Sequence, residues 1–275
     1  MMTTTLRPSG PLHESTEGAK SRDYDVCVNS RPVGRIRLAT HARLGPRVAE
    51  IQDLRIDEPD RRRGRATVAA LAAEEVARGW GCAQIVAVVP VTASGGRTLA
   101  AALGYVERSR RMAKTLPPAP PALPLGVRAR AMTPEEFTPW AEHSVRSYAK
   151  DWADRGVPEE QARAKAAADY ETLLAEGLAT PGNRLSVLLH DGTAVGTLWL
   201  AESDGHAFVY DVEVGPEHRG RGHGRSLMLL AEQQCLEAGK DRIGLHVFAG
   251  NTPALRLYES LGYETTEYAL YKPLL

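Results

Sequence analysis

The residues of this chain best suited to do chemistry lie between Arg219 and Arg225, where three glycines alternate with arginines and a histidine. Glycine lets backbone amides approach a bulky ligand, and the unpaired N–H groups at the start of a helix attract anions. Because the apolar run 227–231 follows, we expect this loop to open a helix and to bind a phosphate or pyrophosphate. The residues expected to hold it are Arg219, Gly220, Arg221, Gly222, His223, Gly224 and Arg225.

The stretch before the loop has the two-residue period of a strand, from 208 to 214. Strict alternation places Tyr210 on the face of Val212, and Asp211 and Glu213 together on the opposite face. The loop has no Gly-Lys-Ser/Thr ending, and its glycines do not follow the strand directly. It therefore fits neither a nucleotide-hydrolase P-loop nor a dinucleotide-binding fold.

The loop resembles the signature of the GNAT superfamily, the acyl-CoA N-acyltransferases. Their motif, Gln/Arg-x-x-Gly-x-Gly/Ala after a strand, is matched by Arg219, Gly222 and Gly224. In that family a further strand, here 242–248, precedes a helix that starts Asn-x-x-Ala and continues with Tyr and then Gly-Phe/Tyr at four-residue steps. The matching residues are Asn251, Ala254, Tyr258, Gly262 and Tyr263. The chain is similar to this superfamily over most of 126–275.

The resemblance implies an α/β fold and direct transfer of an acetyl group from acetyl-CoA to a primary amine, with no metal. It implies that the main chain of Val212 and Val214 holds the pantetheine and thioester where this strand separates from its neighbour. It also implies that Asn251 contacts the cofactor and that Tyr258 protonates the departing thiolate.

The proton-transfer roles leave alternatives. Tyr258 also lies on an ordinary core-facing stripe of its helix, so packing is the other interpretation. Glu213 is the preferred base, directly or through a water; Asp211 shares its face, and a solvated strand face is the alternative. His246 on the next strand is a second candidate base or a structural histidine. His218 and His223, beside the loop, are expected to be surface or phosphate contacts rather than catalysts.

The chain contains an internal repeat, because Gly64 aligns with Gly222 at an offset of 158 residues (222 − 64) without gaps across about fifty residues. Further pairs at this offset are Asp53 with Asp211, Arg61 with Arg219, Leu71 with Leu229, Ile85 with Ile243, Gly104 with Gly262 and Tyr105 with Tyr263. We therefore expect two GNAT-like modules in tandem, each a twisted mixed β-sheet flanked by helices.

The expected domain bounds follow from composition. Residues 1–22 are predicted to be a disordered polar tail, and 23–116 a truncated N-terminal GNAT-like module. Residues 117–125 are rich in proline, which disfavours helix and central strand, so we expect an extended linker there. Residues 126–275 are then the catalytic C-terminal module.

The N-terminal module lacks the residues expected to do the chemistry. Its loop keeps the Arg-x-x-Gly-x-Ala form from Arg61 to Ala66. The positions that correspond to Glu213, Asn251 and Tyr258 hold Arg55, Ala93 and Ala100. We expect a module that does not catalyse and that either still holds CoA or only supports the other module.

Composition argues against several classes of protein. Lys+Arg and Asp+Glu are both 34, so the formal net charge is zero and favours neither a nucleic-acid nor a membrane-surface partner. No run approaches a membrane span, and residues 1–22 lack the apolar core of a signal peptide. The 3 cysteines show no metal-binding spacing, which indicates buried free thiols and predicts a cytoplasmic protein.

The acceptor is left open among small metabolites, amino acids, antibiotics and protein amines. Its site is expected within 134–200, where the candidate lining residues, each individually better explained by packing, are Tyr148, Asp151, Trp152, Tyr170 and Trp199. The competing interpretation is a non-catalytic CoA-sensing or partner-binding tandem GNAT protein. Either would be a monomeric pseudo-dimer or a homodimer.

Overall fold

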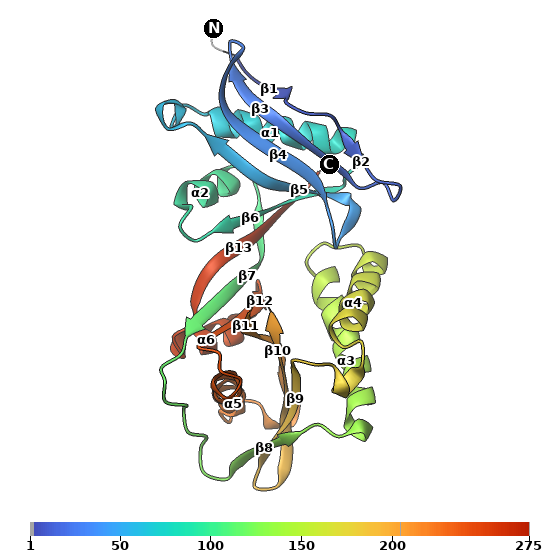
Figure 1. Cartoon of the computed structure of the whole chain (residues 1–275), viewed down its shortest axis with the longest axis vertical. Coiled ribbons are helices and arrows are strands. Elements are labelled where there is room, and N and C mark those ends of the chain that lie inside the picture. The colour runs from blue at the N-terminus through green and yellow to red at the C-terminus, as the bar shows by residue number, and fades with distance from the viewer. Residues whose placement is uncertain (1–2, 204, 275) are drawn as a thin grey trace. The chain divides into compact units, whose positions relative to one another are not determined.

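The computed structural model describes residues 3–203 and 205–274, and the chain forms two compact units (Figure 1). The N-terminal unit comprises Met1–Ser109 and Glu267–Leu275, and the C-terminal unit comprises Arg110–Thr266. Each unit contains a β-sheet with both parallel and antiparallel neighbours and helices packed on it, which confirms the α/β fold class.

The sheet of the N-terminal unit has the strand order β1-β3-β4-β5-β6-β13, with β2 paired to β3. Its core lies between this sheet and helices α1 and α2. The elements are β1 (Thr4–Pro8), β2 (His13–Glu14), β3 (Lys20–Val28), β4 (Arg31–His41), β5 (Gly45–Ile56), α1 (Arg65–Gly79), β6 (Gln84–Pro90), α2 (Ser94–Ala102) and β13 (Glu264–Pro273).

The sheet of the C-terminal unit has the strand order β7-β12-β11-β10-β9-β8. The elements are β7 (Val106–Thr115), β8 (Val127–Ala131), α3 (Pro134–Ala153), α4 (Glu159–Leu173), β9 (Asn183–His190), β10 (Thr193–Ser203), β11 (His206–Val214), α5 (His223–Glu237), β12 (Arg242–Phe248) and α6 (Thr252–Ser260). Helices α3 and α4 cover one face of the sheet through an aromatic core, and α5 covers the other face through an aliphatic core (Figure 1).

The internal repeat is present in the structure at the same offset of 158. Helix α1 corresponds residue for residue to α5, α2 to α6, and β6 to β12. The parallel register repeats as well, because Ala49↔Ile85 in the N-terminal unit becomes Ala207↔Ile243 in the C-terminal unit. The prediction of two GNAT-like modules is therefore confirmed at the level of individual strand pairs.

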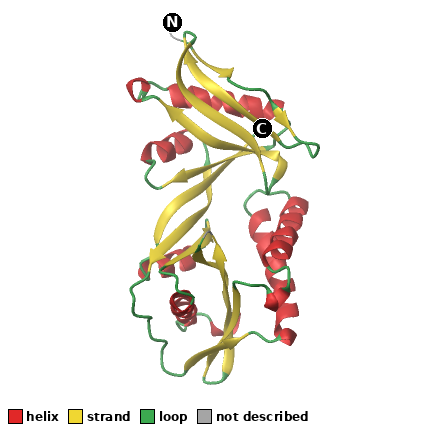
Figure 2. Cartoon of the chain, viewed as in Figure 1, coloured by secondary structure: helices red, strands yellow, loops and turns green. Residues whose placement is uncertain are grey.

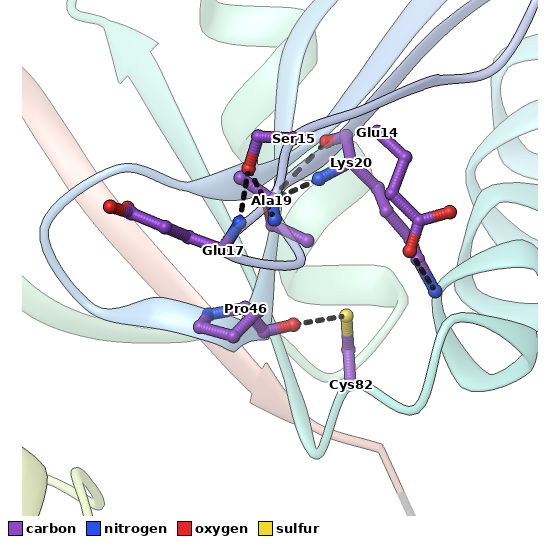
Figure 3. Close-up of polar contacts among 8 residues, drawn as sticks. Glu14, Ser15, Glu17, Ala19, Lys20, Pro46 and Cys82 are labelled. Carbon is purple, nitrogen blue, oxygen red and sulfur yellow. Dashed lines mark hydrogen bonds and ion pairs between the residues drawn. The ribbon is translucent and has the colours of Figure 1, made fainter.

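The prediction of a disordered tail over residues 1–22 is wrong where the structure describes it; Met1 and Met2 lie outside the described residues. β1 pairs with β3, and Leu6 packs on the core, because an edge strand is held by backbone hydrogen bonds whatever the polarity of its side chains. Between β2 and β3, Ser15 Oγ accepts hydrogen bonds from the amides of Glu17 (3.3 Å) and Ala19 (3.1 Å), which fix the turn (Figure 3).

Two other features bear on the expected domain bounds. The proline-rich stretch 117–125 is irregular and joins β7 to β8 (Figure 2). The units, however, do not divide at this stretch: residues 110–116 belong to the C-terminal unit, and 267–275 belong to the N-terminal unit. Over the described parts of the chain, helices long and apolar enough to cross a membrane are absent.

Candidate active site

The glycine-rich loop has the backbone geometry of an anion-binding helix start. Gly220 (φ 76°) and the N-cap Gly222 (φ 85°) are left-handed, a conformation that favours glycine. The amide of Ser226 donates to the Gly222 carbonyl at 3.2 Å, so helix geometry leaves the amides of His223 and Gly224 without intrahelical acceptors. The loop can therefore present N–H groups to a phosphate.

The third glycine of the motif has a packing reason. A Cβ at Gly224 would lie 3.2 Å from Leu257 Cδ2, so the absence of a side chain lets α5 approach α6 closely. At Gly222 a Cβ would meet open space, so only the backbone conformation requires glycine there.

The arginines of the loop have different surroundings. Arg219 Nε donates to the Val214 carbonyl at 3.1 Å, which ties the loop back to the end of β11. Arg225 donates to Ser260 Oγ at the end of α6, and Arg221 is exposed. All three side chains are on the surface, where their charge favours an anionic ligand.

β11 separates from β12 as it approaches the loop. The two strands are paired in parallel only as far as Val209↔Leu245. Beyond this point Val212 and Val214 continue along β11 without partners on β12, which confirms the expected separation of the strands. Their main-chain groups are therefore not paired with β12, although the Val214 carbonyl accepts a hydrogen bond from Arg219 Nε.

β11 also carries a β-bulge that the alternation pattern did not predict. Trp199 of β10 lies opposite Asp211, and Leu200 lies opposite Val209, so Tyr210 is an extra residue. The predicted placement of Tyr210 and Asp211 on opposite faces is therefore wrong. Tyr210 stacks on Trp199 on the α3–α4 face, and Asp211 points to the same face.

The two carboxylates of β11 share this face, as predicted, but differ in environment. Glu213 Oε2 lies 3.0 Å from His143 Nε2 of α3, and Glu213 Oε1 lies 3.9 Å from Arg219 Nη2. Asp211 Oδ2 is buried and has no hydrogen-bond partner of normal geometry among the described residues. Burial, with the charge of Glu213 second, raises the pKa of Asp211 to about 6 against the opposing effects of Trp140 and His143.

Tyr258 lies in the buried part of α6 with its ring against Tyr263. Burial raises the pKa of Tyr258 to about 12, and the charge of Asp211 adds to the shift. The hydroxyl is therefore protonated at neutral pH and can donate a proton. Asn251 is the N-cap of this helix, since its side-chain oxygen accepts from the Ala254 amide at 3.2 Å.

Two histidines near the site, His246 and His223, have lowered pKa values. Burial, followed by the charges of Arg111, Lys165 and Arg155, lowers the pKa of His246 to about 4, so His246 is neutral at pH 7. The expectation of a surface side chain is wrong for His223, which is buried.

The His223 ring packs against His190, with ring centroids 5.0 Å apart. Burial and the nearby positive groups lower its pKa. Only its main-chain amide remains available to an anion at the loop.

The wall opposite β11 is aromatic. Tyr148, Trp152, Tyr170 and Trp199, all predicted, lie in one network of ring contacts, whereas Asp151 instead pairs with Arg155. The prediction missed Trp140 and Ser144 of α3, whose Nε1 and Oγ atoms are buried and have no partner of normal geometry within the described part of the chain. Trp140 touches the rings of Tyr170 and Trp199 and influences the Asp211 carboxyl. Its apolar helical spacing offered no signal that separates it from core packing.

Other reactive groups lie elsewhere or are inert. The three cysteines are free and buried, as predicted, and burial raises the pKa of Cys235 to about 11, so its thiol is protonated. A cavity of about 280 Å³ lies near the C-terminal end of α5, beside Gln234 and Lys240, and is lined by none of the predicted site residues. No cluster of His, Cys, Asp or Glu placed to hold a metal occurs within 3–203 and 205–274.

A family model described as the Acetyltransferase (GNAT) family matches residues 6–105 and 138–263. The chain belongs to the GNAT acetyltransferase family. The uncharacterized N-acetyltransferase YycN of Bacillus subtilis is 31% identical over 150 residues, 52% of this chain and 96% of that protein. A mycothiol acetyltransferase of Thermomonospora curvata is 31% identical over 216 residues, 76% of this chain and 68% of that protein. A tandem GNAT protein from the clavulanic acid biosynthesis pathway shares the fold, with a TM-score of 0.50 at 22% identity, over 95% of this chain and 85% of that one.

The first GNAT repeat keeps the loop geometry but has no tyrosine at the position of Tyr258. Arg62 (φ 60°) and Gly64 (φ 74°) are left-handed like Gly220 and Gly222, and Arg61 Nε donates to the Ile56 carbonyl at 2.9 Å. The counterpart of Asp211 is Asp53, which is paired with Arg35 at 2.9 Å. The counterpart of Tyr258 is Ala100.

Proposed function

We propose that this GNAT protein is an acetyl-CoA-dependent N-acetyltransferase, and that its C-terminal unit transfers the acetyl group to a primary amine. The observation that carries the proposal is that one unit combines the glycine loop, a strand that separates from its neighbour, and the buried, protonated Tyr258. The family and the relatives named as N-acetyltransferases support the same activity.

The loop and β11 would hold the donor. The amides and arginines of residues 219–225 would bind its diphosphate, and the main chain of Val212 and Val214 would hold the pantetheine. Gly222 leaves room at the loop, since a Cβ there would have no neighbour within 4 Å. Asn251 would act mainly by capping α6, with its amide group free to reach the donor. Acetyl-CoA would supply the thioester that is attacked.

Asp211 is the proposed base. An attacking amine must lose a proton, and a carboxylate with a pKa near 6 is ionised at pH 7 yet basic enough to accept it. Glu213, the base preferred from sequence, already contacts His143 Nε2, so we assign it to orienting α3 against β11. Glu213 stays the alternative base, and the kinetics of Asp211→Asn and Glu213→Gln distinguish the two carboxylates.

Tyr258 is the proposed acid. As the C–N bond forms and the C–S bond breaks, the thiolate takes a proton from the Tyr258 hydroxyl, and the proton from the amine goes to the Asp211 carboxylate. The ammonium gives its first proton to solvent before the attack. Asp211 then releases its proton to solvent and Tyr258 regains one from solvent, so both groups return to their starting states. With a pKa of about 12, the Tyr258 hydroxyl is protonated at physiological pH.

The aromatic wall supports a primary amine as acceptor. An ammonium group is stabilised by a carboxylate and by the faces of aromatic rings, and Asp211 faces Trp140, Tyr170 and their neighbours. The N-terminal unit is proposed not to catalyse, because Ala100 offers no hydroxyl and the Asp53 carboxylate is paired with Arg35.

The test combines calorimetry with acetyl-CoA and an assay of thiol release with a panel of primary amines. Heat of binding together with amine-dependent thiol release supports the proposal. Heat without release for any amine favours the CoA-sensing alternative. The absence of heat with the folded protein would overturn both.

A further inference from the structure

Each unit contains a strand segment that comes, in the sequence, directly after the repeat of the other unit. β7 begins just after Tyr105, but its residues from Arg110 belong to the C-terminal unit, where Met112 and Leu116 are buried in the core of α5, α6 and β12. β13 begins just after Tyr263, but its residues from 267 belong to the N-terminal unit and are buried there. The last strands of the two repeats are therefore exchanged.

Each exchanged segment brings a lysine to a buried glutamate. Lys114 Nζ lies 2.7 Å from Glu232 Oε1 in the C-terminal unit, and Lys272 Nζ lies 2.7 Å from Glu74 Oε2 in the N-terminal unit. The glutamate side chains are 3% and 2% exposed. Because the offset of 158 relates both lysines and both glutamates, the two ion pairs are equivalent. A buried carboxylate that loses its partner is strongly destabilising, so each unit depends on the other repeat for one cation.

In the C-terminal unit this lysine also contacts the end of the helix that carries Tyr258. Lys114 Nζ lies 5.7 Å from the centroid of the Tyr263 ring, and a Cβ at Gly262 would lie 4.0 Å from Lys114 Cε. The amide of Tyr263 donates to the Tyr258 carbonyl at 3.0 Å, and the two rings are 6.0 Å apart. Lys114, Tyr263 and Tyr258 therefore form one chain of contacts that begins at the Glu232 carboxylate.

We propose that Lys114 is a positioning residue for Tyr258, so that the last strand of the first GNAT repeat completes the active site of the second. Lys114 holds Glu232 and the Tyr263 ring in place, and Tyr263 fixes the end of α6 where the Tyr258 hydroxyl must meet the thiolate. This rests on the proposed function through the acid role of Tyr258. The first repeat, which has Ala100 at the position of Tyr258, would then contribute to the chemistry through a positioning residue.

The N-terminal unit supplies the matched control. The amide of Tyr105 donates to the Ala100 carbonyl at 3.0 Å, and Lys272 Nζ lies 5.8 Å from the Tyr105 ring, so the same contacts end on an alanine. Lys272→Met breaks the equivalent ion pair with Glu74, but in this unit the position of Tyr258 is held by Ala100, which has no hydroxyl.

The kinetic test compares Lys114→Met, Lys114→Arg and Lys272→Met in the full chain. We expect Lys114→Met to lower kcat by about tenfold or more, since a general acid contributes roughly 10²–10⁴-fold. KM for acetyl-CoA should change by less than about threefold, because the loop amides are untouched. Lys114→Arg should restore most of kcat, and Lys272→Met should leave it unchanged. Equal losses for Lys114→Met and Lys272→Met would show a general loss of stability and overturn the proposal.

A double variant separates charge from position. Lys114→Met with Glu232→Gln removes both charges and restores folding if Lys114→Met alone is too unstable to study. The proposal expects this pair to keep a low kcat. Recovery of wild-type kcat would mean that Lys114 only neutralises Glu232, and the positioning role would be withdrawn.

Hydrogen exchange tests the contact chain without turnover. Lys114→Met should speed amide exchange in α6 and at Tyr263 by roughly tenfold, and Lys272→Met should do so in α2 and at Tyr105. Unchanged α6 exchange in Lys114→Met would overturn the inference. If the wild-type chain releases no thiol with any amine, the proposed function fails, and the exchange pattern still decides whether Lys114 orders the Tyr258 helix.

Discussion

The Glu213 carboxylate lies 3.0 Å from His143 Nε2, and this contact joins β11 to α3. Two residues earlier on the same strand face, Asp211 has a buried oxygen without a partner of normal geometry. Burial raises the pKa of Asp211, whereas the Glu213 carboxylate is already in contact with the His143 ring. The neighbouring carboxylates are therefore suited to different tasks.

The first prediction separates these tasks. Asp211→Asn should lower kcat by about 10²-fold or more, because it removes the group that accepts the amine proton. Glu213→Gln should lower kcat by less than about tenfold, since it weakens only the contact with α3. Steady-state kinetics with one accepted amine checks both variants; the reverse order of effects would return the base to Glu213.

The second prediction concerns the stability of the same variant. Asp211 has a pKa of about 6 in the folded protein against 3.8 as the ordinary value, so the folded state binds more protons between about pH 4 and pH 6. Stability contributed by this group is therefore lost as pH rises through that window. Asp211→Asn should raise the free energy of unfolding at pH 7 by up to roughly 3 kcal/mol, with no gain below about pH 4. Denaturant unfolding at both pH values measures this, and a gain that is independent of pH would contradict it.

The third prediction concerns the acid. Tyr258→Phe should lower kcat by roughly 10²-fold while the Kd for acetyl-CoA changes by less than about threefold, because the ring and its packing remain. Tyr105→Phe removes a buried hydroxyl from the N-terminal unit and should leave kcat unchanged. Calorimetry and thiol release are measured on both variants. An unaltered rate in Tyr258→Phe would remove the acid role.

The fourth prediction uses the two equivalent loop glycines. Gly222 and Gly64 are both N-caps with positive φ, and a Cβ at either would meet open space. Alanine at each should therefore cost a similar 1–2 kcal/mol or so of stability through backbone strain alone. Only Gly222→Ala should also weaken acetyl-CoA binding, by about tenfold, if the C-terminal loop is the one that binds the diphosphate. A matching loss of affinity in Gly64→Ala would assign a donor site to the N-terminal unit.

Much of this architecture was readable from local patterns. The glycine loop and the helix that follows it depend on residues within one or two turns, and the expected helix after the loop matches α5. The offset of 158 residues read from the sequence also relates the paired residues of equivalent strands in the two units. These features are local or duplicated, so the sequence shows them directly.

The features that were missed depend on contacts between distant segments. The bulge at Tyr210 is invisible to a period of two, because one inserted residue only shifts the pattern against β10. His143 is exposed on a helix 70 residues from its partner Glu213, and no spacing rule connects them. The exchange of β7 and β13 is likewise hidden, since a strand shows which of its faces is apolar but not which sheet it joins.

The last prediction follows from that exchange. Residues 267–275 bury Tyr268, Leu270 and Leu274 in the core of the N-terminal unit and bring Lys272 to Glu74. Leu270→Ala should therefore destabilise the N-terminal unit by about 2–5 kcal/mol, although residue 270 follows the C-terminal repeat. Proteolysis with cleavage sites mapped by mass spectrometry should show cuts within 20–109 before cuts within 126–266.

Leu245→Ala on β12 is the matched control, because Leu245 is buried in the core of the C-terminal unit. It should reverse the order of cleavage, since the cavity it leaves lies in the other core. If Leu270→Ala instead exposed 126–266 first, the last strand would be stabilising its own repeat, and the assignment of 267–275 to the N-terminal unit would be wrong.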